Sequence, residues 1–248
     1  MTPLITANQL EEILNSGENV LLCDCRFDLA NPEAGRKAYE ESHIPGAIYV
    51  DLDKDLSGAK TGGNGRHPLP SPEAWAQTKT RLGICPNTLV VAYDKQGSVY
   101  ASRLWWMLKA TGHANVRVLD GGLDAWNGPM GSIPRTPTPC NQAIAPMPYT
   151  GLVLVDEVVA NLETKKNKII DARAEDRFRG QNETLDPVGG HIPGAMNRFF
   201  KNNLNASAFK TPEQLFKEFS ESLGATKASE VIHQCGSGVT ACHNLLAM

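Results

Sequence analysis

The chain repeats its own sequence once, and this self-similarity constrains its fold more than any other feature. The segment LLCDCR, which holds Asp24 and Arg26, returns as IIDAR, which holds Asp171 and Arg173. SHIPGA returns as GHIPGA, and VVAYDKQGSVYASRL matches VIHQCGSGVTACHNL once one extra residue is allowed in the first loop. The three matches keep the same order at a displacement of about 140 to 148 residues, which chance does not produce. The sequence therefore predicts two homologous domains.

The domain boundaries follow from these matches and from a proline-rich stretch between them. We expect a first domain over residues 1–130 and a second over 151–248, joined by an extended linker at 131–150. Each repeat begins with a helix pattern, at 7–14 and at 155–162, and continues into an apolar strand that ends in Asp-x-Arg. A second apolar strand follows later in each repeat. Strands that alternate with helices predict an α/β fold in which each domain is a parallel sheet with helices on both faces.

The second repeat is shorter than the first. After Leu108 the first repeat continues through a strand pattern at 115–119 and a helix start that ends at Trp126. The second repeat stops at Met248, which is the counterpart of Leu108. We therefore expect the second domain to be truncated by roughly 25 residues or more, with one strand fewer in its sheet.

Cys235 is the residue whose surroundings point most directly to chemistry. Val231 and Ile232 end a buried strand, and a helix starts near Ala241. The loop between them consists of Gly236, Ser237, Gly238, Val239 and Thr240. Its small residues let successive N–H groups turn inward around the sulfur at a helix N-terminus, and both effects favour the thiolate. The loop therefore predicts a nucleophile at neutral pH, whereas the alternative is a small buried core cysteine.

The first repeat carries Asp94 where the second carries Cys235. Both residues follow a strand, and sites in parallel sheets lie at the carboxyl ends of the strands. A carboxylate cannot replace a thiolate nucleophile in sulfur chemistry. Only the second domain is therefore expected to be catalytic.

Composition excludes several classes of partner. With a net charge of −3 and scattered basic residues, the chain has no footprint for nucleic acid. The start has no basic region followed by an apolar core, and no apolar run is long enough for a membrane, so we expect a cytoplasmic protein. The six cysteines show no disulfide-framework spacing and no CxxC pair, which favours reduced thiols. The six histidines form no metal-ligand pattern, and no metal or other cofactor is expected.

The doubled Asp-x-Arg, the doubled HIPGA and the segment CGSGVTA resemble the two-domain rhodanese sulfurtransferases, over nearly the whole chain. That family includes thiosulfate and 3-mercaptopyruvate sulfurtransferases. The resemblance implies a double displacement, in which Cys235 takes a sulfane sulfur from a small donor, becomes a persulfide, and passes the sulfur to a thiophilic acceptor. The acceptor is then cyanide, a thiol or thioredoxin.

The residues after the cysteine bear on the donor. Thiosulfate-preferring relatives carry basic side chains there, whereas this chain has Gly236 and Ser237. The loop is thus similar to the mercaptopyruvate type, which implies that Ser237 works with His67 and Asp53 of the first domain. A hydroxyl held by histidine and aspartate can polarise a keto group or relay a proton to the departing enolate. The alternative for His67 is a loop histidine that bonds a neighbour.

Recognition of the donor is expected to involve arginine. Arg177 matches a family arginine that binds the donor's carboxylate, a contact suited to a guanidinium. Mercaptopyruvate enzymes have a second arginine between this position and HIPG, but this chain has QNETLDPVGG, with no basic residue. Arg179 or Arg198 can substitute, or the donor preference is relaxed and thiosulfate is used; each arginine can also be a surface charge. Asp171 and Arg173 are interpreted as a structural pair that holds loops.

Two other classes of protein share part of this pattern. Phosphatases with a cysteine in an amide-lined loop need an arginine six residues later, and the sixth residue after Cys235 is Ala241. The remaining alternative is an inactive rhodanese-like module that binds partners or anions.

Overall fold

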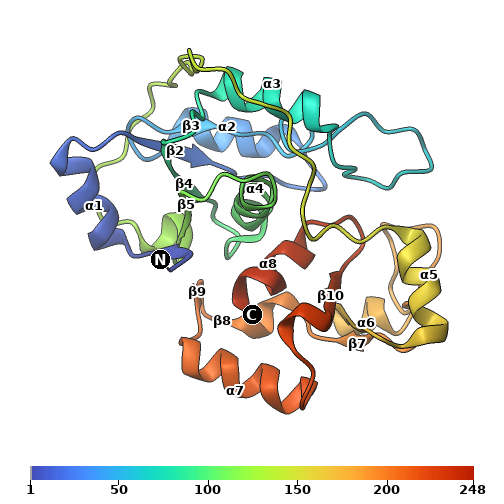
Figure 1. Ribbon diagram of the computed structural model, residues 1–248. Coiled ribbons are helices and arrows are strands. Elements are labelled where there is room, and N and C mark those ends of the chain that lie inside the picture. Colours follow the sequence, from blue (N-terminus) through green and yellow to red (C-terminus); the bar gives the residue numbers. More distant parts are fainter. Residues whose placement is uncertain (1) are drawn as a thin grey trace. The chain divides into compact units, whose positions relative to one another are not determined.

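The computed structural model describes residues 2–248 and divides the chain into two compact units (Figure 1). The first unit runs up to Thr150 and includes Ala206–Ala208, and the second contains Gly151–Asn205 and Phe209–Met248.

The first unit is a five-stranded parallel sheet with the strand order β1-β5-β4-β2-β3. Its strands are β1 (Leu4–Ile5), β2 (Val20–Asp24), β3 (Ile48–Tyr49), β4 (Leu89–Tyr93) and β5 (Val116–Leu119). Its helices are α1 (Ala7–Ser16), α2 (Glu33–Glu41), α3 (Pro72–Leu82), α4 (Val99–Ala110) and the 3-10 turn η1 (Gly122–Ala125). All five residues of β4 are buried, as expected of a central strand covered on both faces. The prediction of an α/β fold with parallel sheets is confirmed.

The second unit contains a three-stranded parallel sheet with the order β10-β6-β7 and a separate β8-β9 pair. Its strands are β6 (Lys168–Asp171), β7 (Met196–Asn197), β8 (Leu204–Asn205), β9 (Ala208–Phe209) and β10 (Val231–Gln234). Its helices are α5 (Val155–Thr164), α6 (Glu175–Phe178), α7 (Pro212–Leu223), α8 (Thr240–Ala247) and the 3-10 turns η2 (Phe200–Asn203) and η3 (Ala228–Glu230). Among the described residues β10 pairs with β6 alone, whereas its counterpart β4 lies between β2 and β5.

The chain between the two repeats lies along the first unit. Gly131 bridges His43, and the Arg135 N–H donates to the Tyr39 hydroxyl at 3.0 Å. Cys140 forms a disulfide with Cys85, 55 residues earlier. The expectation of reduced thiols is therefore wrong for this pair. The two residues meet through a long-range contact, which the spacing of cysteines in the sequence does not predict.

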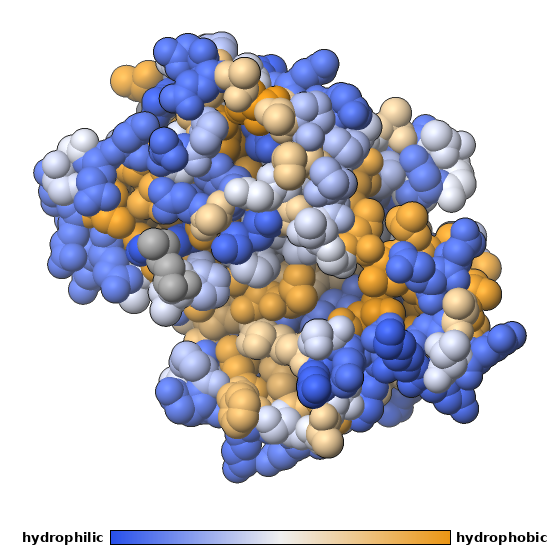
Figure 2. Space-filling view, viewed as in Figure 1, coloured by the Kyte–Doolittle hydropathy of each residue, from blue (hydrophilic) through white to orange (hydrophobic). Residues whose placement is uncertain are grey.

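The start of the second unit exposes an apolar helix face. Val155, Val159 and Leu162 of α5 are 72%, 56% and 36% exposed, and Figure 2 shows hydrophobic residues at the surface over this helix. In the first repeat, Leu10 of α1 is fully buried. Ile13 and Leu14 of α1 are partly buried against the same core, so the apolar face is packed more completely in α1 than in α5.

Candidate active site

The predicted nucleophile lies where the sequence places it, directly after β10 and before α8. Gly238 has a φ of 74°, in the left-handed region that favours glycine, and its N–H donates to Cys235 Sγ at 3.2 Å. The loop therefore turns back toward the sulfur. Cys235 is half-buried, whereas Asp94, at the matching position of the first unit, is fully buried.

The corresponding loop of the first unit shows what this backbone shape holds. Asp94, fully buried, accepts N–H bonds at Oδ1 from Gln96 (2.9 Å) and Ser98 (2.8 Å). Its Oδ2 accepts N–H bonds from Tyr100 (2.8 Å) and Ala101 (3.0 Å). Burial raises the pKa of Asp94, and these four backbone donors oppose the rise. The loop thus encloses an acceptor at the start of α4.

The two loops are built alike. Ser98 and Gly238 both have a positive φ, of 68° and 74°. Each is followed by a valine: Val99 is the first residue of α4, and Val239 lies just before α8. Each also donates its N–H to the residue that follows the strand, Asp94 or Cys235. The repeat seen in the sequence therefore extends to the backbone of the site.

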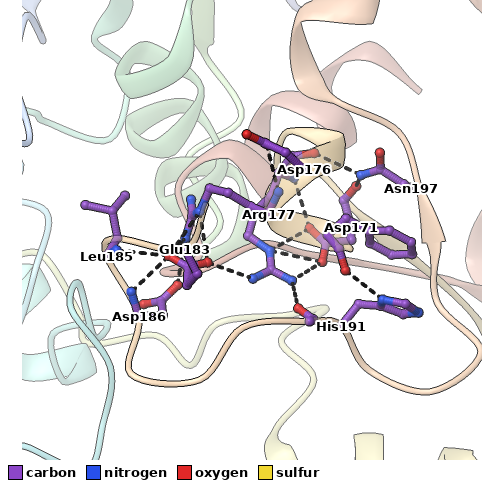
Figure 3. Close-up of polar contacts among 11 residues, drawn as sticks. Asp171, Asp176, Arg177, Glu183, Leu185, Asp186, His191 and Asn197 are labelled. Atoms are coloured by element: carbon purple, nitrogen blue, oxygen red, sulfur yellow. Dashed lines mark hydrogen bonds and ion pairs between the residues drawn. The ribbon is translucent and has the colours of Figure 1, made fainter. Parts of the chain in front are cut away.

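The Asp-x-Arg motifs hold the neighbouring loops. Arg173 Nη2 donates to Asp171 Oδ2 at 2.6 Å and to the Gly190 carbonyl at 2.6 Å, just before the HIPGA segment. Figure 3 labels Asp171 of this pair and His191 of the segment. Arg26 makes the same contacts in the first unit, with Asp24 and with the Ser42 carbonyl, both at 2.7 Å. The structural interpretation of this pair is confirmed.

The HIPGA histidines are structural as well. His43 makes a ring nitrogen contact with the Tyr39 carbonyl at 2.6 Å, and His191 makes one with the Phe178 carbonyl at 2.7 Å. His191 also stacks on the Phe178 ring, with centroids 3.8 Å apart. The motif therefore fixes the end of a helix against the loop that follows it.

The strand ends of the second sheet bring the cysteine loop and the arginine segment to one edge. Gln234 of β10 pairs in register with Asp171 of β6, and the Ala172 N–H donates to the Gln234 carbonyl at 2.9 Å. Cys235 follows β10, and the α6 helix with Arg177 follows β6. Both segments thus leave the carboxyl ends of adjacent parallel strands.

The three predicted donor-binding arginines all have carboxylate partners. Arg177 bonds Glu183 and Asp186, and Arg179 pairs with Glu175 at the surface. Arg198 is held more deeply, and its contacts are with three side chains. Its Nη2 donates to Glu218 at 2.8 Å, its Nε donates to Asn203 at 2.7 Å, and its guanidinium lies 4.1 Å from the Phe219 ring centroid.

Sequence reasoning missed a buried polar network beneath α8. Asn203 of η2 donates to Asn244 Oδ1 at 2.7 Å, and Asn244 donates to the Arg198 carbonyl at 2.8 Å. His243 beside them is fully buried and stacks on Phe209. The signal available in the sequence was the polar His-Asn pair inside an otherwise apolar helix.

His67 and Asp53 lie together in the first unit. The His67 Nε2 is 3.6 Å from Asp53 Oδ1, and Lys60 contacts the same oxygen at 3.2 Å. Burial lowers the pKa of His67 to about 4, with Asp53 acting in the opposite direction, so the imidazole is neutral at neutral pH. Ser237 belongs to the second unit, and its cooperation with this pair stays a prediction.

Within residues 2–248, no helix is both long and apolar enough to cross a membrane.

Known proteins resemble the chain along almost all of its length. The rhodanese-like domain model matches residues 6–129 and 154–248. A protein of Pseudomonas aeruginosa named as a probable 3-mercaptopyruvate sulfurtransferase is 41% identical, covering 99% of this chain and 88% of the relative. The human 3-mercaptopyruvate sulfurtransferase is 36% identical (97% and 83% covered), and the bovine thiosulfate sulfurtransferase is 34% identical (98% and 84% covered).

Solved structures agree with the sequence comparison. The crystal structure of SseA from Escherichia coli, described as a 3-mercaptopyruvate sulfotransferase with the rhodanese fold, superimposes with a TM-score of 0.85 at 29% identity. It covers all of this chain and 93% of that one. Both the paired sequence repeats and the paired parallel sheets are therefore those of a known family, and the chain belongs to the tandem rhodanese-like sulfurtransferases.

Proposed function

We propose that the protein is a 3-mercaptopyruvate sulfurtransferase that uses Cys235 as its nucleophile. The observation that carries the proposal is the loop after β10, in which the Gly238 N–H donates to the Cys235 sulfur and α8 begins just beyond. The matching loop of the first repeat surrounds the Asp94 carboxylate with four N–H groups. This supports the proposal that the same backbone shape stabilises a thiolate or a persulfide anion in the second repeat.

The reaction has two displacements. In the first, the Cys235 thiolate attacks the donor sulfur, the bond between that sulfur and C3 of mercaptopyruvate breaks with its electron pair on carbon, and the pyruvate enolate takes a proton. Cys235 then carries the sulfur as a persulfide. In the second, an acceptor thiolate attacks the outer sulfur and Cys235 leaves as a thiolate. The first displacement oxidises the Cys235 sulfur while C3 of the donor is reduced, and the second returns Cys235 to the thiolate, so the complete cycle needs no external oxidant or reductant.

Ser237, His67 and Asp53 are proposed to supply the proton for the enolate. In this relay the Ser237 hydroxyl gives its single proton to the enolate and is reprotonated through the His67 imidazole, which in turn takes up a proton from water. The lowered pKa of His67, about 4, makes the neutral imidazole the starting form of the relay. The absence of basic residues at positions 236 and 237 favours a keto-acid donor over a dianion.

Thiosulfate is the second candidate donor. The segment between Arg177 and HIPGA lacks a basic residue, and one close relative is named as a thiosulfate sulfurtransferase. Side-by-side measurement of kcat/KM for the two donors decides between them, and a higher value for thiosulfate would reverse our assignment.

The sulfur acceptor is proposed to be a thiol, thioredoxin or cyanide. The protein is proposed to be located in the cytoplasm, where reduced thiols are abundant. The Cys85–Cys140 disulfide is the observation against that location. An inactive binding module is the non-enzymatic alternative.

Intact mass spectrometry after incubation with each donor tests the proposal. We expect the protein to gain one sulfur atom on Cys235 and Cys235→Ser to gain none, because an alcohol is a far poorer sulfur nucleophile of nearly the same size. Cys242→Ser is the matched control, since Cys242 lies in the same loop–helix segment, with its Sγ 3.2 Å from the Gly238 carbonyl. We expect that variant to keep most of the activity. Sulfur retained by Cys235→Ser, or equal losses in both variants, would contradict the assignment.

A further inference from the structure

The guanidinium of Arg177 offers two edges that are occupied unequally, by Glu183 and by Asp186, and both of these residues lie beside it in Figure 3. Glu183 covers the edge formed by Nε and Nη2. It accepts from Nε at 3.2 and 3.0 Å and from Nη2 at 2.9 Å. At the other edge, formed by Nη1 and Nη2, Asp186 accepts one hydrogen bond from Nη2 at 2.9 Å. Within residues 2–248, Nη1 has no hydrogen-bond acceptor.

Glu183 is a fixed support. Its side chain is 6% exposed, and its Oε1 accepts the N–H groups of Leu185 at 2.9 Å and Asp186 at 3.0 Å. Arg173 Nη1 lies 3.6 Å from Oε2. Burial acts to raise the pKa of Glu183, but Arg177 and the two N–H groups outweigh it and lower the pKa to about 2. Glu183 therefore stays charged and holds Arg177 in one orientation.

Asp186 makes fewer hydrogen bonds with Arg177 than Glu183 does. Its side chain is 20% exposed, and a single hydrogen bond joins it to that guanidinium. A planar carboxylate binds most favourably across two N–H groups in parallel. A donor carboxylate on the Nη1–Nη2 edge would make two bonds where Asp186 makes one, and the same Nη2 hydrogen would serve both acceptors in turn.

We propose that Asp186 is an internal counter-ion that competes with the donor for Arg177 and thereby sets the affinity for carboxylate-bearing donors. The inference rests on the proposed function, in which Arg177 binds the donor's carboxylate. Because Arg177 and Cys235 follow adjacent strand ends of one sheet, a short keto acid can direct its carboxylate to the first and its sulfur to the second. In the absence of donor, Asp186 neutralises the guanidinium and keeps it oriented.

The test is the Michaelis constant for 3-mercaptopyruvate in Asp186→Asn and Asp186→Ala. Removing one partly exposed counter-ion should lower KM by about twofold to fivefold and leave kcat unchanged, the size expected of such an ion pair. The inhibition constant of pyruvate, which carries the same carboxylate, should fall by the same factor. Glu175→Gln is the matched control. It removes a negative charge from α6, the helix that carries Arg177, but Glu175 pairs with Arg179 and not with Arg177. We expect no change of KM in that control.

Arg177→Ala separates the possible failures. We expect it to raise KM, and Asp186→Asn to have no further effect in that background. If Arg177→Ala raises KM while neither Asp186 variant lowers it, the counter-ion inference is wrong and the proposed function stands. If Arg177→Ala leaves KM unchanged, Arg177 does not bind the donor and the inference fails with that assignment. If no variant, nor the native protein, forms a persulfide, the proposed function itself fails and the inference fails with it.

Discussion

Individual residues of the site divide into those that react and those that hold. Arg173 and His191 each bind a backbone carbonyl, and the same contacts recur at Arg26 and His43 in the first repeat, which has Asp94 at the position of Cys235. Residues that recur without the nucleophile hold the fold. Cys235 and Ser237 have no such counterparts, since the first loop carries Asp94 and a different sequence.

The proton relay is testable at this scale. We expect Ser237→Ala and His67→Ala to reduce the rate with mercaptopyruvate by about 10²- to 10⁴-fold, the usual worth of general acid–base help. The leaving group from thiosulfate is sulfite, which needs no proton, so the rate with thiosulfate should change much less. Steady-state rates with both donors make the comparison. Equal losses with the two donors would show that these residues act on structure or on the nucleophile.

His67 also gives the first unit a pH-dependent stability of predictable sign. Its pKa in the folded state is about 4, below the usual value near 6.5, because burial disfavours the imidazolium. The unfolded chain therefore binds the proton first, and the stability that His67 confers is complete above pH ~6.5 and is lost as pH falls toward ~4. In His67→Gln the urea midpoint should fall less between pH 7.5 and 5.

Tryptophan fluorescence is the right probe for this experiment, since all four tryptophans lie in the first unit, at 75, 105, 106 and 126. His113 has a pKa lowered by burial in the same unit, so part of the pH dependence should remain, and His113→Gln measures that part. Identical pH dependence in His67→Gln and the native protein would mean that His67 titrates normally.

At the scale of elements, one strand–loop–helix unit serves two purposes. In both repeats, a residue with positive φ lies just ahead of the helix and turns its N–H toward the residue after the strand. In the first repeat the N–H groups of this unit bind the Asp94 carboxylate, and these hydrogen bonds stabilise the folded domain. In the second it holds the half-buried Cys235 thiol, so the N–H donors of the loop are available to the reacting sulfur.

Asp94→Asn tests the structural use of this unit. The amide offers one acceptor oxygen in place of two, so its NH₂ group would face buried N–H donors, and we expect the first unit to lose about 1–3 kcal/mol. Asp124→Asn is the control, since Asp124 is half exposed and pairs with Lys95 at 3.6 Å, and its loss should stay within about 0.5 kcal/mol. Urea unfolding followed by tryptophan fluorescence measures both. Equal effects of the two changes would mean that the hydrogen bonds to Asp94 contribute little to the free energy of unfolding.

For the whole molecule, the internal repeat was enough to predict the α/β class, the parallel sheets and the position of Cys235 at a strand end, because each depends on local pattern. The Cys85–Cys140 disulfide and the carboxylate partners of Arg177 were not predictable in this way. They depend on how loops without a regular pattern pack in three dimensions. The sequence did show that QNETLDPVGG is acidic and lacks arginine, but not that its carboxylates bind Arg177.

The two sheets differ in what surrounds their corresponding strands, and this difference predicts unequal stability. β4 is buried throughout and paired on both sides, whereas β10 is paired with β6 alone among the described residues and only Ile232 in it is fully buried. Amides protected by fewer buried contacts open at lower free energy. We therefore expect native-state hydrogen exchange to be slow in β4 and β2 and faster in β10 and β6. A donor that converts Cys235 to the persulfide should slow exchange around the loop at 236–240 and in β10, because a bound anion gives the loop amides a stronger acceptor. Equal protection of β4 and β10 before the donor is added would show that the three-stranded sheet is as stable as the five-stranded one.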